Sequence, residues 1–187
     1  MSSTDVPPRP GLLATITANR FLALLNESET PLSRSDIAQL SGISKPAISD
    51  AARRLEDSGV IVATGMREGR RGRVAALYEI NAARGHSVAL ALDSAFVSAR
   101  SVRLDGTIAF DKTEPLPHDA GSDYVIAVAS GLLEAVEKAS PTPLLAAAIS
   151  VADPVDRITG EIIPMADSVF PAGHFNPVRD LNIEAAE

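Results

Sequence analysis

The stretch that most constrains the fold of this chain runs from Leu32 to Tyr78. It holds two short amphipathic patterns at helical spacing around a Ser-Gly turn, and then two strand-like runs that flank an Arg-rich loop. Helix, turn, helix and hairpin in this order make a winged helix-turn-helix, which places one helix in the DNA major groove and a basic loop beside it. We therefore predict an α+β domain that binds double-stranded DNA.

Local signals set the helix ends in this stretch. Ser33 can cap the first of the two helices, with Asp36 at the third position as a variant of the capping box. Gly42 is suited to end that helix. Ser44 is expected to cap the next helix, and Pro46 lies in its first turn, where no backbone N–H is needed.

The second of these helices has two different faces. One apolar stripe contains Ile48, Ala51, Ala52 and Leu55. Polar residues project from the opposite side, so we expect Lys45, Ser49 and Arg53 to contact base edges. Arginines of the following loop, which reads MREGRRGR, are expected to neutralise phosphates. The predicted DNA-binding set is Ser44, Lys45, Pro46, Ser49, Asp50, Arg53, Arg67, Arg70, Arg71 and Arg73.

Two of the polar residues have alternative interpretations. Arg54 is better explained as a surface partner of Asp57 or Asp50 than as a DNA contact. Asp50 is unusual on a DNA-facing surface, and it either accepts from a cytosine amine or orients Arg53 or Arg54. A winged helix can also serve protein contacts alone, but the loop here has no apolar tip.

The distribution of charge divides the chain in two. The net charge of −7 splits into +1 over residues 1–82 and −8 over residues 83–187, which indicates two domains with different partners. The chain contains no Cys, which excludes disulfides and fits a cytoplasmic protein. The N-terminus does not resemble a signal peptide, and the most apolar run, Leu144 to Val151, is too short to cross a bilayer.

Patterning along the chain predicts three regions: a flexible arm at 1–11, the winged helix-turn-helix at 12–82 and an α/β domain with a mixed sheet at 83–187. The sheet is expected in the order β-β-β-α-β. The remaining predicted elements are a helix at Leu12–Ser28, strands at Val60–Thr64 and Arg73–Ile80 with a turn at Gly65–Gly72, a linker at Asn81–Gly85, strands at Val88–Leu92, Ser98–Leu104, Thr107–Lys112 and Leu144–Val151, a hairpin turn at Asp105-Gly106, a helix at Tyr124–Ala139 and a short strand at Glu161–Pro164.

No residue cluster in the sequence indicates a cofactor, a metal or a catalytic site. His86, His118 and His174 have no ligand spacing and are expected at the surface. Asp93 is better explained as a turn residue at a strand end than as an acid of a phosphate loop. Asp153 and Asp156 fit the turn-like segment DPVDRITG without any catalytic role.

The chain resembles the transcriptional regulators of the ROK family (repressors, open reading frames, kinases). ISKPAISDAARRLEDSGVI is similar to the recognition-helix segment of the family's MarR-like head, and VALALDSAFVSARSVRLDGTI to its first β-hairpin. LAAAISVADPVDRITGEI is similar to the strand and loop that follow. The resemblance implies a partial actin-like, ribonuclease H-like sugar-kinase lobe after the DNA-binding head. It also implies a repressor of carbohydrate-related genes.

The chain departs from this family where kinase chemistry would lie. ROK kinases carry an Asp-x-Gly-x-Thr phosphate loop, but here Ala95, Phe96 and Val97 follow Asp93 and Ser94. The family's catalytic Asp, its sugar-contacting Glu and His, and its Cys-rich zinc motif would all follow Glu187, so we expect a truncated chain that is not an enzyme. Two alternatives are a sugar kinase with a fused DNA-binding head, and a dimerisation module that modulates a full-length paralogue.

The same departures lead to expectations about partners. We expect a homo-oligomer, because one helix cannot cover both faces of the sheet in the second domain. A sugar effector is expected only if the missing lobe is supplied, and DNA binding by this chain is expected to be insensitive to sugars. The sequence does not identify the operator, the effector sugar, or activation as opposed to repression.

Overall fold

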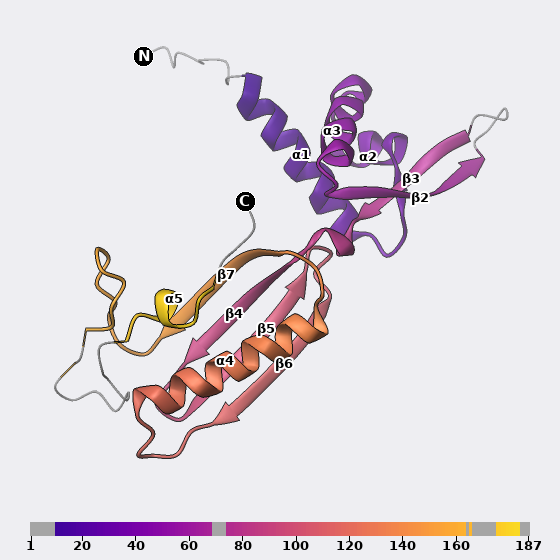
Figure 1. The fold of residues 1–187 in the computed structure, drawn as a ribbon. Coiled ribbons are helices and arrows are strands. Elements are labelled where there is room, and N and C mark those ends of the chain that lie inside the picture. The colour runs from indigo at the N-terminus through magenta and orange to yellow at the C-terminus, as the bar shows by residue number, and fades with distance from the viewer. Residues whose placement is uncertain (1–9, 69–73, 164, 166–174, 184–187) are drawn as a thin grey trace, which may run out of the picture. The chain divides into compact units, whose positions relative to one another are not determined.

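The structure is a computed structural model, and it describes residues 10–68, 74–163, 165 and 175–183. The chain forms two compact units, residues 1–81 and residues 82–187 (Figure 1). Each unit has its own hydrophobic core, so each is described by itself.

The first unit packs three helices against a small antiparallel sheet. Its elements are α1 (Pro10–Glu27), β1 (Leu32–Ser33), α2 (Arg34–Ser41), α3 (Lys45–Asp57), β2 (Ile61–Glu68) and β3 (Val74–Ile80). The strands lie in the order β1-β3-β2. The core gathers Phe21 and Leu24 from α1, Ile37 from α2, and the predicted apolar stripe of α3. The expected helix, turn, helix and hairpin are confirmed.

The helix ends in this unit follow most of the predicted signals. Ser33 and Asp36 form a complete capping box at the start of α2, and Gly42 ends that helix in the left-handed conformation with φ of 69°. Ser44 occupies the N-cap position of α3, but its side chain makes no capping hydrogen bond, so that part of the prediction is wrong. Pro46 lies in the first turn as expected.

The hairpin after α3 differs from the prediction. Val60–Thr64 was too short for the first strand, because β2 continues to Glu68. Gly65 therefore lies inside the strand and not in the turn, and the pairing register shifts between Ala63 and Gly65. A glycine accommodates the local kink of such a bulge, which explains its position here.

The second unit is a mixed four-stranded sheet with one long helix on one face (Figure 1). Its elements are η2 (Ala82–Arg84), β4 (His86–Leu92), β5 (Phe96–Arg103), β6 (Ile108–Pro115), α4 (Ser122–Ala139), β7 (Leu144–Val151) and α5 (Pro177–Asp180). The strands lie in the order β6-β5-β4-β7, and β4 and β7 are parallel while the other pairs are antiparallel. The predicted order β-β-β-α-β is confirmed.

Three smaller expectations for this unit need correction. The predicted linker contains a 3-10 helix, η2. The expected strand near Glu161 is reduced to a single bridge between Val155 and Ile162, and Pro164 lies outside the described residues. The turn of α5 was not predicted; Asn176 caps it by accepting from the Arg179 N–H at 3.0 Å.

The two faces of the second sheet differ in cover. Alternate side chains of β4, from His86 to Leu92, are buried on the face that carries α4. On the other face Ala89 of β4 and Ala148 of β7 lie opposite each other, and both are exposed. The prediction that His86 is a surface residue is wrong, since only 4% of it is exposed. His86 lies two residues before Val88, so strand alternation turns it toward the core.

Candidate nucleic-acid interface

The turn between α2 and α3 holds these helices in the arrangement of a helix-turn-helix. Gly42 donates its N–H to the Ala38 carbonyl at 3.1 Å, and its left-handed conformation turns the chain out of α2. The Ile43 N–H then donates to the Ser41 hydroxyl at 3.1 Å, and α3 begins at Lys45. This turn leaves the first turn of α3 at the surface, where a DNA-reading helix needs it.

The outward side of α3 carries most of the residues predicted to read DNA. Ser44, Lys45, Pro46 and Arg53 are exposed, and Ser49 and Asp50 are half-buried. On the opposite side Ile48, Ala51, Ala52 and Leu55 are buried, as the apolar stripe predicted. The structure thus brings the α3 residues of the predicted set onto one accessible face. Whether they contact DNA stays a prediction.

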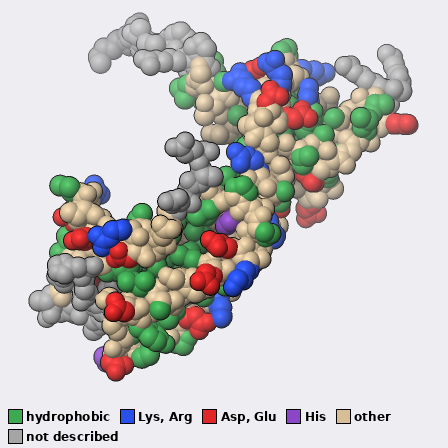
Figure 2. All heavy atoms as spheres, viewed as in Figure 1, with side chains coloured by type: hydrophobic (Ala, Val, Ile, Leu, Met, Phe, Trp, Pro, Cys, Tyr) green, Lys and Arg blue, Asp and Glu red, His purple; other side chains and the backbone are tan. Residues whose placement is uncertain are grey.

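Asp50 binds both arginines of this helix. Its carboxylate accepts from Arg53 at 2.6 Å through Oδ1 and from Arg54 through Oδ2. Hydrogen bonds from Arg54 and then Arg53 hold the pKa of Asp50 below its ordinary value of 3.8. The alternative that paired Arg54 with Asp50 matches this geometry. Figure 2 shows acidic and basic side chains mixed over α3, so the surface is not uniformly positive.

Arg67 lies on β2 but reaches back to the start of α2. Its Nη2 donates to both carboxylate oxygens of Asp36, at 2.8 and 2.7 Å, and lies 3.4 Å from the Ser33 hydroxyl. Partial burial would raise the pKa of Asp36, but the bonds from Arg67 and Ser33 outweigh it and lower the pKa below 3.8. Arg67 therefore ties the wing hairpin to the capped end of α2. The other predicted wing residues, Arg70, Arg71 and Arg73, lie outside the described residues.

A second contact between α2 and the wing was not predicted from the sequence. Arg34 donates to the Tyr78 hydroxyl at 2.5 Å, and its guanidinium carbon lies 5.2 Å from the centre of that ring. Glu56 of α3 is 3.5 Å from the same guanidinium. The buried Tyr78 ring meets Phe21 of α1 edge-on. Arg34 thus links α2, α3 and β3, and the only sequence signal was an aromatic residue on the inward side of a strand.

In the second unit, the residues at the position of a kinase phosphate loop form a tight hairpin turn. The Asp93 carboxylate accepts from the Ala95 N–H at 3.0 Å, and the Asp93 N–H donates to the Phe96 carbonyl at 2.9 Å. This matches the interpretation of Asp93 as a turn residue. Asp156 likewise accepts from the Ile158 and Thr159 N–H groups, which hold its pKa below 3.8.

The described residues offer neither a cluster of metal ligands nor a membrane-spanning helix. Within 10–68, 74–163, 165 and 175–183, no group of three or more His, Cys, Asp or Glu side chains could hold a metal ion. No helix in this described part is long and apolar enough to span a membrane. His118 is exposed, and His174 lies outside the described residues.

Comparison with known proteins agrees with the helix-turn-helix. The sequence profile of a family described as "Winged helix-turn-helix DNA-binding" matches residues 22–62, which cover the end of α1, α2, α3 and the start of β2. The first unit is therefore a winged helix-turn-helix domain of the DNA-binding class. A search of curated proteins finds no match to the chain.

The fold of the chain also has a counterpart among solved structures. The crystal structure of a ROK family transcriptional regulator, described as a homolog of the E. coli MLC protein, matches with a TM-score of 0.56 and 20% identity. The match covers 90% of this chain and 43% of that protein, so this chain spans less than half of its length. The fold of this chain, a winged helix-turn-helix followed by a mixed α/β sheet, is therefore similar to that of part of a ROK regulator. A Campylobacter jejuni peroxide stress regulator matches at a TM-score of 0.29 and 15% identity, over 78% of this chain and 91% of that one, which is too low to support an inference.

Proposed function

We propose that this chain is a cytoplasmic DNA-binding transcriptional regulator that represses carbohydrate-related genes. The observation that supports it best is the outward side of α3, where Lys45, Ser49 and Arg53 lie clear of the core at the start of a helix-turn-helix. The likeness of its fold to a ROK family transcriptional regulator supports the same class of function.

The roles of individual residues follow from their positions. Lys45, Ser49 and Arg53 contact base edges in the major groove, with Arg53 suited to a bidentate bond to guanine. Arg70 and Arg71 belong to the wing and neutralise phosphates of the DNA. Ser44 and Pro46, at the start of the helix, lie close to the DNA backbone. Arg73 supports the contact between the wing and DNA. Arg67 acts through Asp36 and fixes the direction of the hairpin.

Asp50 limits binding to wrong sequences. Its carboxylate holds Arg53 and Arg54 beside it, and its own charge repels phosphates. An operator that offers both a guanine to Arg53 and a cytosine amine to Asp50 compensates for that repulsion, whereas random DNA does not. This role makes the mixed charge of α3 a source of specificity.

The second unit acts in regulation and in assembly, and not in phosphoryl transfer. Ala95 and Val97 stand where a phosphate loop would need Gly and Thr, and the Asp93 carboxylate is bonded within its own turn. Self-association uses the sheet face that carries Ala89 and Ala148, both exposed. A sugar effector acts only when a second lobe is supplied and the two lobes enclose a sugar-binding cleft. DNA binding by this chain alone is therefore insensitive to mono- and disaccharides.

The experiment is selection of a preferred duplex from a random library, followed by titration of that duplex and a scrambled one by fluorescence anisotropy. Arg53→Ala is expected to reduce the preference for the selected duplex by about 10- to 100-fold, which corresponds to the loss of one bidentate base contact. Arg20→Ala is the control, because Arg20 is an exposed arginine of α1 that pairs with Glu27. If no sequence is enriched, or if both variants lose preference equally, the proposed role of α3 is wrong.

A further inference from the structure

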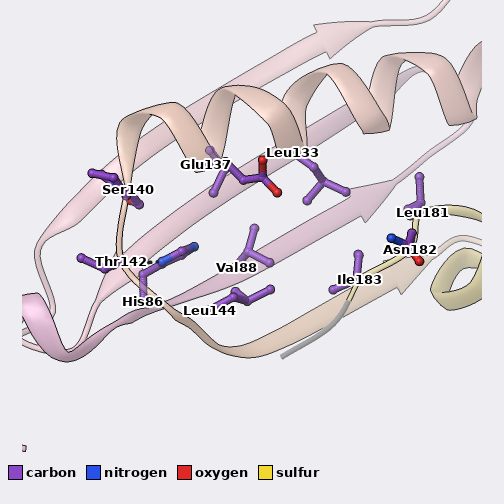
Figure 3. Close-up of a pocket in the computed structure, with 12 residues that line it drawn as sticks. His86, Val88, Leu133, Glu137, Ser140, Thr142, Leu144, Leu181, Asn182 and Ile183 are labelled. Atoms are coloured by element: carbon purple, nitrogen blue, oxygen red, sulfur yellow. Dashed lines mark hydrogen bonds between the residues drawn. The ribbon is translucent and has the colours of Figure 1, made fainter. Parts of the chain in front are cut away.

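The second unit contains a pocket that the proposed function does not use. It opens between the last turns of α4, the starts of β4 and β7, and the segment after α5 (Figure 3). Its volume is about 370 Å³, in the range of small-molecule sites. Val88, Leu133, Leu144, Leu181 and Ile183 form its apolar walls.

The pocket also has polar groups in its lining. Figure 3 shows the His86 ring and the Glu137 carboxylate directed into the same space. The Nδ1 of His86 lies 3.2 Å from the Thr142 hydroxyl, and the other ring nitrogen faces the cavity. In the tautomer that carries its proton on Nδ1, this second nitrogen is an acceptor. Asn182, at the rim, adds an amide.

The net charge of the lining is negative. Glu137 is the only Asp, Glu, Lys or Arg among the described residues that line the pocket. Burial lowers the pKa of His86 and the nearby charge of Arg103 acts in the same direction, against a hydrogen bond with the Thr142 backbone, so the neutral imidazole is favoured. One carboxylate above apolar walls suits an amphiphilic cation, because the cation neutralises Glu137 while its body leaves water.

We propose that this pocket binds a small organic cation, an apolar body that carries one protonated amine. The ammonium group donates to Glu137 and to the free ring nitrogen of His86, and the apolar body packs against Val88, Leu133 and Ile183. The site lies wholly within the second unit, so it requires neither DNA nor a second lobe.

The test uses the full chain and phenethylamine as the probe. Two compounds of similar shape, 2-phenylethanol and phenylacetate, replace the ammonium by a neutral and a negative group. Calorimetry and amide NMR are expected to show saturable binding of phenethylamine, with chemical shift changes at pocket residues. The affinity of 2-phenylethanol is expected to be at least about tenfold lower than that of phenethylamine, because the alcohol cannot form the charge-assisted bond to Glu137. Phenylacetate is expected not to bind.

Two variants on one helix identify the contact. Glu137→Gln is expected to weaken phenethylamine binding about tenfold or more, and Glu137 is exposed enough for this variant to fold. Glu134→Gln makes the same change of charge on α4 outside the pocket, where Glu134 pairs with Lys138, and is expected to leave binding unchanged. Equal affinity for amine and alcohol, equal effects of the two variants, shifts confined to other parts of the chain, or no saturable amine binding would each overturn the proposal.

Discussion

The network around Asp36 makes a quantitative prediction about the stability of the first unit. The Asp36 carboxylate accepts from the Ser33 N–H at 2.9 Å, from the Ser33 hydroxyl at 2.7 Å and from Arg67 at 2.7 Å. Arg67 donates to the second carboxylate oxygen as well, at 2.8 Å. Asp36→Ala removes every one of these bonds and leaves Ser33, which is 1% exposed, without the carboxylate. We expect α2 to lose the carboxylate half of its capping box, while the backbone N–H of residue 36 still donates to the Ser33 hydroxyl, and the wing to lose its ion pair with α2.

The size of the effect follows from the exposure of each contact. A hydrogen bond to a charged group contributes about 1.5–3 kcal/mol when buried, and the half-exposed Asp36 retains only part of that. The ion pair with the exposed Arg67 adds about 0–1 kcal/mol. The variant is therefore expected to lower the free energy of unfolding of this unit by about 1–3 kcal/mol. For a domain of this size, that lowers Tm by about 5–20 °C.

The pH dependence has a definite sign. The folded-state pKa of Asp36 lies below the ordinary value of 3.8, so its contribution is fully present above that value and is lost as pH falls through the folded pKa. The difference in stability between the parent and Asp36→Ala is expected to stay constant from about pH 5 to 8 and to shrink in more acidic solution.

The assay is urea unfolding followed by the NMR methyl signals of Ile37 and Ile48, which are fully buried in this unit. Ser35→Ala, at an exposed position in the same turn of α2, is the control. Arg67→Ala is expected to cost less than Asp36→Ala, because it leaves the capping box in place. A cost for Asp36→Ala below about 0.5 kcal/mol, the range of ordinary surface substitutions, would refute the reasoning.

Three further predictions concern DNA binding and assembly. Asp50→Asn is expected to free Arg53 and Arg54 for phosphate, so random duplexes should bind more tightly. In a salt titration the slope of log affinity against log salt should steepen by about 1–2, and an unchanged slope contradicts the role given to Asp50. Arg70→Ala combined with Arg71→Ala is expected to weaken the binding of selected and random duplexes alike and to flatten that slope by about 2. A double variant that binds random DNA as tightly as the parent would exclude the contact between the wing and DNA. Ala148→Lys places a charge on the exposed face of β7 and is expected to shift the chain toward monomer in light scattering, whereas an unchanged mass would place the contact between copies elsewhere.

The sequence predicted those parts of the fold that depend on local patterns. The stripe of Ile48, Ala51, Ala52 and Leu55 has helical spacing, and each of these residues is buried. The Asp105-Gly106 turn and the alternation in β4 similarly depend on neighbouring residues. These signals were enough to predict a winged helix-turn-helix and a β-β-β-α-β sheet, and both are confirmed.

Features that depend on contacts between distant residues were not predicted. The bond between Arg67 and Asp36 joins residues 31 positions apart that no local pattern connects. That Arg67 contacts DNA stays a prediction. Arg34 and Tyr78 are 44 positions apart, and no local pattern relates them. His86 was expected at the surface because the sequence placed it in a loop, but it begins β4 and is buried. The pocket combines segments from β4, α4, β7 and the chain after α5, so it exists only in the folded unit.

The position of β4 in the middle of its sheet has a consequence for synthesis on the ribosome. β4 pairs with β5 within one hairpin, but its other edge pairs with β7, and His86 and Leu144 are nearly 60 positions apart. At about 5–20 residues per second, β7 emerges about 3–12 s after β4. During that interval β4, β5 and β6 can pair while one edge of an apolar strand stays open. The nascent chain therefore passes through a stage in which this edge is available to other chains, and slower translation between α4 and β7 lengthens it.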